Sequence, residues 1–198
     1  PIGYSHGFNP HQLMSFGNPL SLGMTSIGEY CDFEFETPVE PREIAERLGA
    51  VMNDGVEIIS AARLSQQAKS AMAELCACEY EAYIDGLVTD EDIAEKLTYF
   101  LAQKEISVMK KTKNHFEKTD IRPDIYSIED ISRDGKPALK LVLAAGSIRS
   151  LRADLTVQTF CEYAGAAFDR FKVRYRRTEM YKELDGKLVP LDKEVAEK

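Results

Sequence analysis

The chain has 198 residues, 44% of them hydrophobic, and a formal net charge of −8 at pH 7. That much apolar material is enough for a folded core and excludes a globally disordered protein. The negative balance argues against a broad surface for nucleic acid or anionic membranes, although it allows a local basic strip.

Transmembrane and export signals are also missing from the sequence. No apolar run approaches the roughly 20 residues of a membrane span, and no signal-peptide pattern opens the chain. Its four cysteines stand at irregular positions. These features predict a protein of the reduced cytoplasm without a membrane segment.

Residues 1–30 are the least ordinary stretch of the chain. They are rich in Gly and Pro, and they show neither the period of a helix nor that of a strand. They also carry apolar side chains such as Phe8, Leu13 and Phe16, more than a solvated linker needs. We therefore predict a long, packed loop, a kind of segment that is often functional.

The residues that follow predict a strand, a helix and a second strand. Residues 29–36 alternate polar and apolar side chains, which is typical of a half-buried strand. Pro41 suits the first turn of a helix whose apolar stripe runs to Met52. After a turn at Asn53-Asp54-Gly55, residues 56–64 predict another strand.

From residue 78 onward the patterns predict strand, helix, strand, hairpin, helix and strand. Residues 78–85 alternate as a strand, and Thr89 followed by Asp92 resembles a capping box that opens a helix. Further elements are expected over residues 106–111, 125–132, 139–145, 155–164 and 171–181, with hairpin turns at Asp134-Gly135 and Asp185-Gly186.

This order predicts an α+β fold made of two ferredoxin-like units. The first, over residues 1–68, would join the Gly/Pro-rich loop to a unit that lacks its N-terminal strand and helix. The second, over residues 69–198, would be complete and end in a hairpin. A truncated first unit would leave a sheet edge exposed.

Basic side chains gather on the last predicted strand. Strand alternation places Phe171, Val173 and Tyr175 on one face and a row of cations on the other. The row consists of Arg170, Lys172, Arg174 and Arg176. Such a row would follow the phosphates of a single RNA strand, unless Glu79 and Glu81 on the neighbouring strand neutralise it. A second basic group, at Lys110, Lys111, Lys113, His115 and Lys118, is more typical of a solvated turn.

Few residues stand in patterns that indicate catalysis. His6 and His11 lack a third ligand at an obvious spacing, so we predict no metal site. Asp120 and Arg122, which precede Pro123, would share one face of an extended segment. They would clamp an anionic ligand or form a scaffold ion pair.

Several ordered motifs resemble a known family. They are Tyr4-Ser5-His6-Gly7-Phe8-Asn9-Pro10-His11, Ser15-Phe16, Pro19-Leu20, Gly23, Gly28-Glu29-Tyr30, Asp120-Ile121-Arg122-Pro123 and Arg177-Thr178-Glu179. The chain resembles radical-SAM-associated proteins of unknown function, which occur as small proteins or fused behind a radical SAM enzyme. It departs from them at His6, where Gln is common, and in lacking the strand and Arg-rich helix that usually precede the loop.

The resemblance implies a radical SAM enzyme as partner, which would carry an iron–sulfur cluster and S-adenosylmethionine, and a connection with RNA. We therefore expect a non-catalytic accessory module that has no cofactor of its own and binds RNA or presents a substrate. The expected binding residues are Tyr4, Ser5, Gly7, Phe8, Asn9, Pro10, His11, Ser15, Phe16, Arg122, Arg174, Arg176 and Arg177. The alternatives are an enzyme whose site combines His11, Asp120 and Arg122, and a scaffold that binds only protein. The sequence does not set the oligomeric state.

Overall fold

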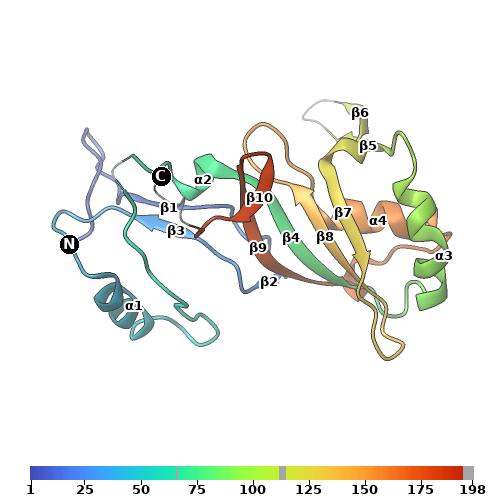
Figure 1. The fold of residues 1–198 in the computed structure, drawn as a ribbon, viewed down its shortest axis with the longest axis horizontal. Coiled ribbons are helices and arrows are strands. Elements are labelled where there is room, and N and C mark those ends of the chain that lie inside the picture. The colour runs from blue at the N-terminus through green and yellow to red at the C-terminus, as the bar shows by residue number, and fades with distance from the viewer. Residues whose placement is uncertain (66, 112–114, 194–198) are drawn as a thin grey trace.

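A largely antiparallel sheet forms the centre of the molecule in a computed structural model that describes residues 1–65, 67–111 and 115–193 (Figure 1). Its main strands lie in the order β10-β9-β4-β8-β7. The short β2 pairs in parallel with the edge of β9 that faces away from β4. The bounds are β2 (Thr25–Ser26), β4 (Leu75–Tyr83), β7 (Ile125–Asp130), β8 (Ala138–Ala144), β9 (Arg174–Leu184) and β10 (Lys187–Pro190).

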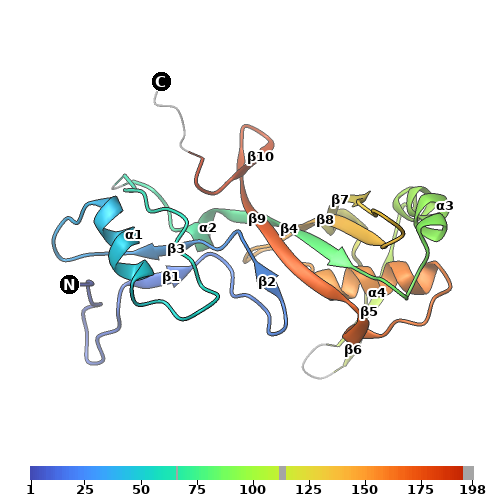
Figure 2. The ribbon, with the colours of Figure 1, turned by 90° about the horizontal axis from the view of Figure 1, so that it is seen from below.

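Two helices cover the apolar face of this sheet, as Figure 2 shows at its right-hand end. Helix α3 (Asp90–Leu101) begins with the predicted capping box, in which Thr89 Oγ1 accepts from Asp92 N at 3.1 Å. Helix α4 (Ala153–Tyr163) packs beside it, with the rings of Phe100 and Phe160 edge to face at 5.5 Å. The alternation predicted for β4 is confirmed, because Cys78, Tyr80, Ala82 and Ile84 all point into this core.

The second half of the chain follows the predicted order of elements. Strand β4, α3, β7, β8, α4 and β9 give β-α-β-β-α-β, and the hairpin between β7 and β8 turns at Gly135. A hairpin of β5 (Ser107–Lys111) and β6 (Phe116–Asp120) is inserted after α3 and forms a separate two-stranded sheet. The α+β class is confirmed, whereas the ferredoxin-like assignment of the two units stays a prediction.

The front of the chain differs more from expectation. Strand β1 (Met14–Phe16) pairs with β3 (Cys31–Phe33), and α1 (Pro41–Gly49) follows. The strand predicted over residues 56–64 is wrong, since these residues pair with no strand in the described part of the chain. An apolar alternation becomes a strand only where its backbone groups find a neighbour.

This front region has no core of its own. Among the described residues up to Ser70, only three glycines are buried, and every other side chain is at least partly exposed. Along the described chain, Ala71 is the first buried residue that is not a glycine, and it begins the short helix α2 (Ala71–Glu74). The front region therefore depends on its attachment to the main sheet for its position.

The opening stretch is packed only in part. It contains the strands β1 and β2, and its residues Met24 and Tyr30 pack against the main core. Phe8 and Leu22, in contrast, are fully exposed, at 103% and 106% of the reference area. The prediction of a loop packed along its length is therefore wrong for these two apolar residues.

Gly28 is the point of closest approach between the opening stretch and β9. A Cβ atom at this position would lie 2.6 Å from the carbonyl oxygen of Thr178 and 2.9 Å from the Cα of Glu179. No side chain fits there unless the backbone of β9 moves. Gly49, at the end of α1, has open space where a Cβ atom would stand, and its φ is not positive.

We predict that Gly28→Ala lowers the free energy of unfolding by about 2 kcal/mol, the usual cost of overpacking a tight site. Gly49→Ala is the matched control and should leave stability unchanged or raise it by up to about 1 kcal/mol, since Ala favours helix over Gly. Urea unfolding followed by circular dichroism measures both values. Equal stability of the two variants would contradict the close approach.

Candidate functional site

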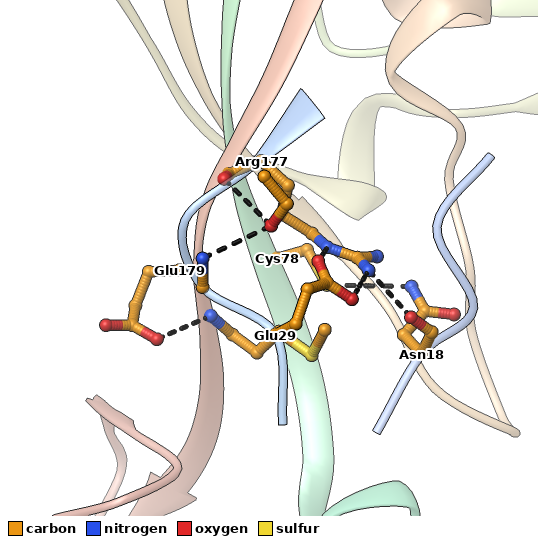
Figure 3. Close-up of polar contacts among 8 residues, drawn as sticks. Asn18, Glu29, Cys78, Arg177 and Glu179 are labelled. Atoms are coloured by element: carbon orange, nitrogen blue, oxygen red, sulfur yellow. Dashed lines mark hydrogen bonds and ion pairs between the residues drawn. The ribbon is translucent and has the colours of Figure 1, made fainter. Parts of the chain in front are cut away.

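Arg177 is the most deeply buried charged residue in the described chain, with 1% of its side chain exposed. Its Nε donates to Glu29 Oε1 at 2.8 Å, and its Nη2 donates to Glu29 Oε2 at 2.5 Å (Figure 3). The same Nη2 donates to the carbonyl oxygen of Asn18 at 2.7 Å. We call Asn18, Glu29 and Arg177 the arginine clamp.

Neighbouring contacts extend the clamp along the backbone of β9. Ile27 N and Ser26 Oγ both donate to the carbonyl oxygen of Arg177, at 3.0 and 3.1 Å. The hydroxyl of Tyr30 donates to Glu179 Oε1 at 2.8 Å. The motifs Gly28-Glu29-Tyr30 and Arg177-Thr178-Glu179 therefore meet side by side, although 148 residues separate Glu29 from Arg177 in the chain.

Burial sets the electrostatics around the clamp. Burial disfavours the charged guanidinium, but the hydrogen bonds and charge of Glu29 outweigh it and raise the pKa of Arg177 above its ordinary value. Burial, together with the hydrogen bond to Glu179, also raises the pKa of Tyr30. Burial likewise raises the pKa of the Cys78 thiol, which accepts a hydrogen bond from Asn18 Nδ2 at 3.7 Å. These shifts favour the charged form of the Arg177 guanidinium and the neutral forms of the phenol and thiol beside it.

Residues 4–12 form a projecting loop at the end of the molecule opposite α3 and α4 (Figures 1 and 2). Its neck is closed by Ser5 N, which donates to the carbonyl oxygen of His11 at 2.8 Å, and by His11 N, which donates to Ser5 Oγ at 2.9 Å. Tyr4 also forms an antiparallel bridge with Gln12. The tip is exposed throughout, so the side chain of Phe8 faces solvent from a closed loop.

The predicted binding residues of the opening stretch fall into two groups. The projecting loop carries Tyr4, Ser5, Gly7, Phe8, Asn9, Pro10 and His11. Ser15 and Phe16 lie instead on β1, where Ser15 Oγ donates to Asp32 Oδ2 at 3.4 Å and Phe16 is half exposed. Only the first group is available as a contiguous exposed segment.

The prediction of an extended segment at Asp120 and Arg122 is wrong, because Arg122 begins a 3₁₀ turn, η1 (Arg122–Asp124). Both residues instead hold the β5–β6 hairpin to the body. Asp120 Oδ1 accepts from the backbone of Ile106 and of Arg122, both at 2.9 Å. The guanidinium of Arg122 donates to the carbonyl oxygens of Leu101 at 3.0 Å and Ile125 at 3.1 Å. Since β6 lies at the other end of the molecule from the projecting loop, the structure does not bring these residues together with His11 (Figures 1 and 2).

The predicted row of four cations on the last strand is wrong. Arg170 and Lys172 lie in a 3₁₀ turn, η2 (Arg170–Lys172), because β9 begins only at Arg174. Arg176 faces Glu81 at 3.9 Å, and the guanidinium of Arg174 lies 5.7 Å from the ring centre of Tyr83. Of the second basic group, Lys118 pairs with Glu105 at 3.2 Å, and Lys113 lies outside the described residues.

The prediction of Arg177 as a binding residue is wrong, because the side chain is buried and occupied by Glu29 and Asn18. A signal for its burial was present in the sequence. Counting by twos from Val173 and Tyr175, which are both buried, places Arg177 on the same inner face. A buried arginine requires a carboxylate or several carbonyl oxygens. The pattern does not reveal which acid would supply them, and neither Glu29 nor Asn18 was expected.

Comparison with known proteins gives a family and no described function. Residues 1–153 match a family described as an uncharacterized protein conserved in bacteria, DUF2344. The chain belongs to the DUF2344 family. The match includes Asn18 and Glu29 of the clamp and ends before Arg177. No curated protein matches the chain, and no solved structure does.

Neither a membrane helix nor a metal centre is present in the described residues of this DUF2344 protein. In that part of the chain, no helix has the length and apolar content needed to cross a membrane. Over the same residues, no three His, Cys, Asp or Glu side chains gather as a metal-binding group.

We predict that Arg177→Ala lowers the free energy of unfolding by about 3 kcal/mol or more, because it breaks a buried pair and leaves a cavity. Its neighbour provides a control: Arg176 is 43% exposed, so Arg176→Ala should cost less than about 1 kcal/mol. Urea unfolding of both variants measures the difference. A clamp without structural importance would give two equal, small effects.

We also predict that the protein loses stability at alkaline pH. Burial raises the pKa of the Cys31 and Cys161 thiols from 9.0 to about 11, and it raises the pKa of Tyr30 and Tyr80 as well. The unfolded chain therefore ionises first, so the stabilisation is complete below pH 9 and is lost as the pH rises towards 11. Urea midpoints should fall from about pH 9 upward. A flat profile would contradict burial of these groups.

Proposed function

We propose that this DUF2344 chain is a non-catalytic accessory module that works with a radical SAM enzyme, by binding the enzyme or presenting a substrate to it. The observation that supports the proposal most is the projecting loop, with a fully exposed Phe8 above a neck closed by Ser5 and His11. An aromatic side chain held in water on a closed loop costs hydration free energy. A partner surface that buries the ring would recover it.

The way in which the loop is held suits a binding role. Backbone hydrogen bonds join Gly3 N to Glu34 O at 2.7 Å and Leu13 N to Gly3 O at 2.8 Å. The same stretch is tied to β9 further along by the arginine clamp. A loop that is already ordered loses less conformational entropy when it docks, and this favours affinity.

A catalytic role is less well supported by the geometry. The alternative enzyme site needs His11 beside Asp120 and Arg122. The projecting loop, which contains His11, lies far from β6, the strand that ends at Asp120 (Figure 1). Asp120 and Arg122 are also occupied by backbone groups. In the proposal, the iron–sulfur cluster and S-adenosylmethionine belong to the partner enzyme, and the chain supplies a surface.

The test is binding to the radical SAM enzyme of the same host, measured by biolayer interferometry after co-expression. We expect a complex whose dissociation constant rises by about tenfold or more for Phe8→Ala, because exposed aromatics that become buried are typical hot spots. Phe116→Ala is the control, since Phe116 is 64% exposed on β6 at the other end of the molecule.

Two outcomes would contradict the proposal. One is that no complex forms with the enzyme. The other is a complex to which Phe8 and Phe116 contribute equally. A third outcome is a complex that is weakened by Phe8→Ala but does not change the activity of the enzyme. It would limit the function to that of a protein-binding scaffold.

A further inference from the structure

The turn before β9 displays an aromatic ring in water. Phe171 is 84% exposed, although Val173, two residues further on, is buried in the core. The turn is held by Asp169, whose Oδ1 accepts from Phe171 N at 3.0 Å and whose carbonyl oxygen accepts from Lys172 N at 3.1 Å. The ring is therefore held outside the core by a fixed turn.

One cation stacks on this ring, and two more follow close by in the chain. The guanidinium of Arg170 lies 4.7 Å from the ring centre of Phe171, and the guanidinium of Arg174 lies 5.7 Å from the ring centre of Tyr83. Lys172 stands between them in the sequence. We call Arg170, Phe171, Lys172 and Arg174 the aromatic–cationic turn. A guanidinium stacked on a ring keeps its N–H donors free for an anion.

Arg170 and Arg174 differ from most other exposed arginines of the described chain. Arg149, Arg152 and Arg176 each have a carboxylate partner, namely Asp124, Asp154 and Glu81. Within the described parts of the chain, no ion pair neutralises Arg170, Lys172 or Arg174, and the two arginines contact aromatic rings instead. The turn is thus a local positive site on a protein of net charge −8.

The combination of groups selects a class of ligand. An acidic peptide would use the cations and leave the rest of the exposed Phe171 ring, beyond its contact with Arg170, in solvent. A single-stranded nucleic acid uses both, because its bases stack on aromatic rings and on guanidinium planes while its phosphates pair with the cations. We propose that the aromatic–cationic turn binds single-stranded RNA.

This inference rests on the proposed function, in which RNA would be the substrate that the module presents. It places the RNA away from the projecting loop, because β9 begins at the end of the main sheet that is far from that loop (Figures 1 and 2). One chain would then hold RNA at one end and the enzyme at the other. The two contacts can be tested independently.

The test is fluorescence anisotropy of a labelled single-stranded RNA of about twelve nucleotides with the whole chain. We expect Phe171→Ala to weaken binding by about tenfold, the usual effect of one lost stacking platform. Phe171→Trp should retain binding, because it keeps the stacking surface. Tyr99→Ala is the control, since Tyr99 is 67% exposed on α3.

Salt dependence tests the cations separately. Three phosphate contacts predict a slope of about −2 for the logarithm of the association constant against the logarithm of the salt concentration. Arg170→Gln with Lys172→Gln removes two of the contacts, so the slope should change to about −0.7. Arg42→Gln with Arg47→Gln changes the net charge equally on α1, where both residues are exposed, and should leave the slope unchanged.

The outcomes separate this inference from the function on which it rests. RNA binding that is unaffected by Phe171→Ala, and whose salt slope responds no more to Arg170→Gln with Lys172→Gln than to the control pair, would overturn the assigned site. Equal binding of polyglutamate, or no RNA binding at all, would overturn the ligand class. In either case the complex with the radical SAM enzyme, which depends on Phe8, would still decide the proposed function.

Discussion

The buried pair of Arg177 and Glu29 is the interaction on which the rest of the structure depends. A guanidinium on a side chain that is only 1% exposed is stable only with full compensation, and here two carboxylate oxygens and one carbonyl oxygen supply it. Each of these acceptors comes from the opening stretch. The contacts that compensate the buried charge of Arg177 therefore also fix the position of the opening stretch against β9.

This coupling matters because the front region cannot hold itself. Its two-stranded sheet and single helix bury no side chain of their own among the described residues, and such small units are marginal in water. The parallel pairing of β2 with β9 and the close approach at Gly28 add to the clamp. Together they give the projecting loop a fixed base, which a binding surface needs.

The sequence predicted the second half of the molecule well because the signals there are local. The alternation of β4, the Thr89–Asp92 capping box and the turn at Gly135 each depend on residues close in the chain. The prediction over residues 56–64 failed because a strand also needs a partner, which local pattern cannot supply. The clamp was not predicted for the same reason. Alternation along the strand indicates burial of Arg177, which the sequence analysis took for a binding residue, but no local pattern indicates that Glu29 meets it.

The basic surface shows the same limit. Counting residues placed four cations on one strand, whereas Asp169 folds Arg170 and Lys172 into a turn and leaves Phe171 between them in solvent. The four cations are therefore not evenly spaced along one strand, and the exposed ring of Phe171 lies next to Arg170. The sequence indicated that cations gather near the last strand, and only the backbone conformation shows that an exposed Phe171 lies among them.

Hydrogen exchange of individual amides, measured by NMR on the whole chain, tests the central claim most directly. Gly17 N donates to Tyr30 O at 2.9 Å and Ile27 N donates to Arg177 O at 3.0 Å, and these two residues lie close in the chain to the clamp residues Asn18 and Glu29. If the clamp fixes this stretch, both amides exchange slowly, as amides in β9 do, while the tip of the projecting loop exchanges fast. Exchange of Gly17 and Ile27 at the rate of an unstructured peptide would contradict the account.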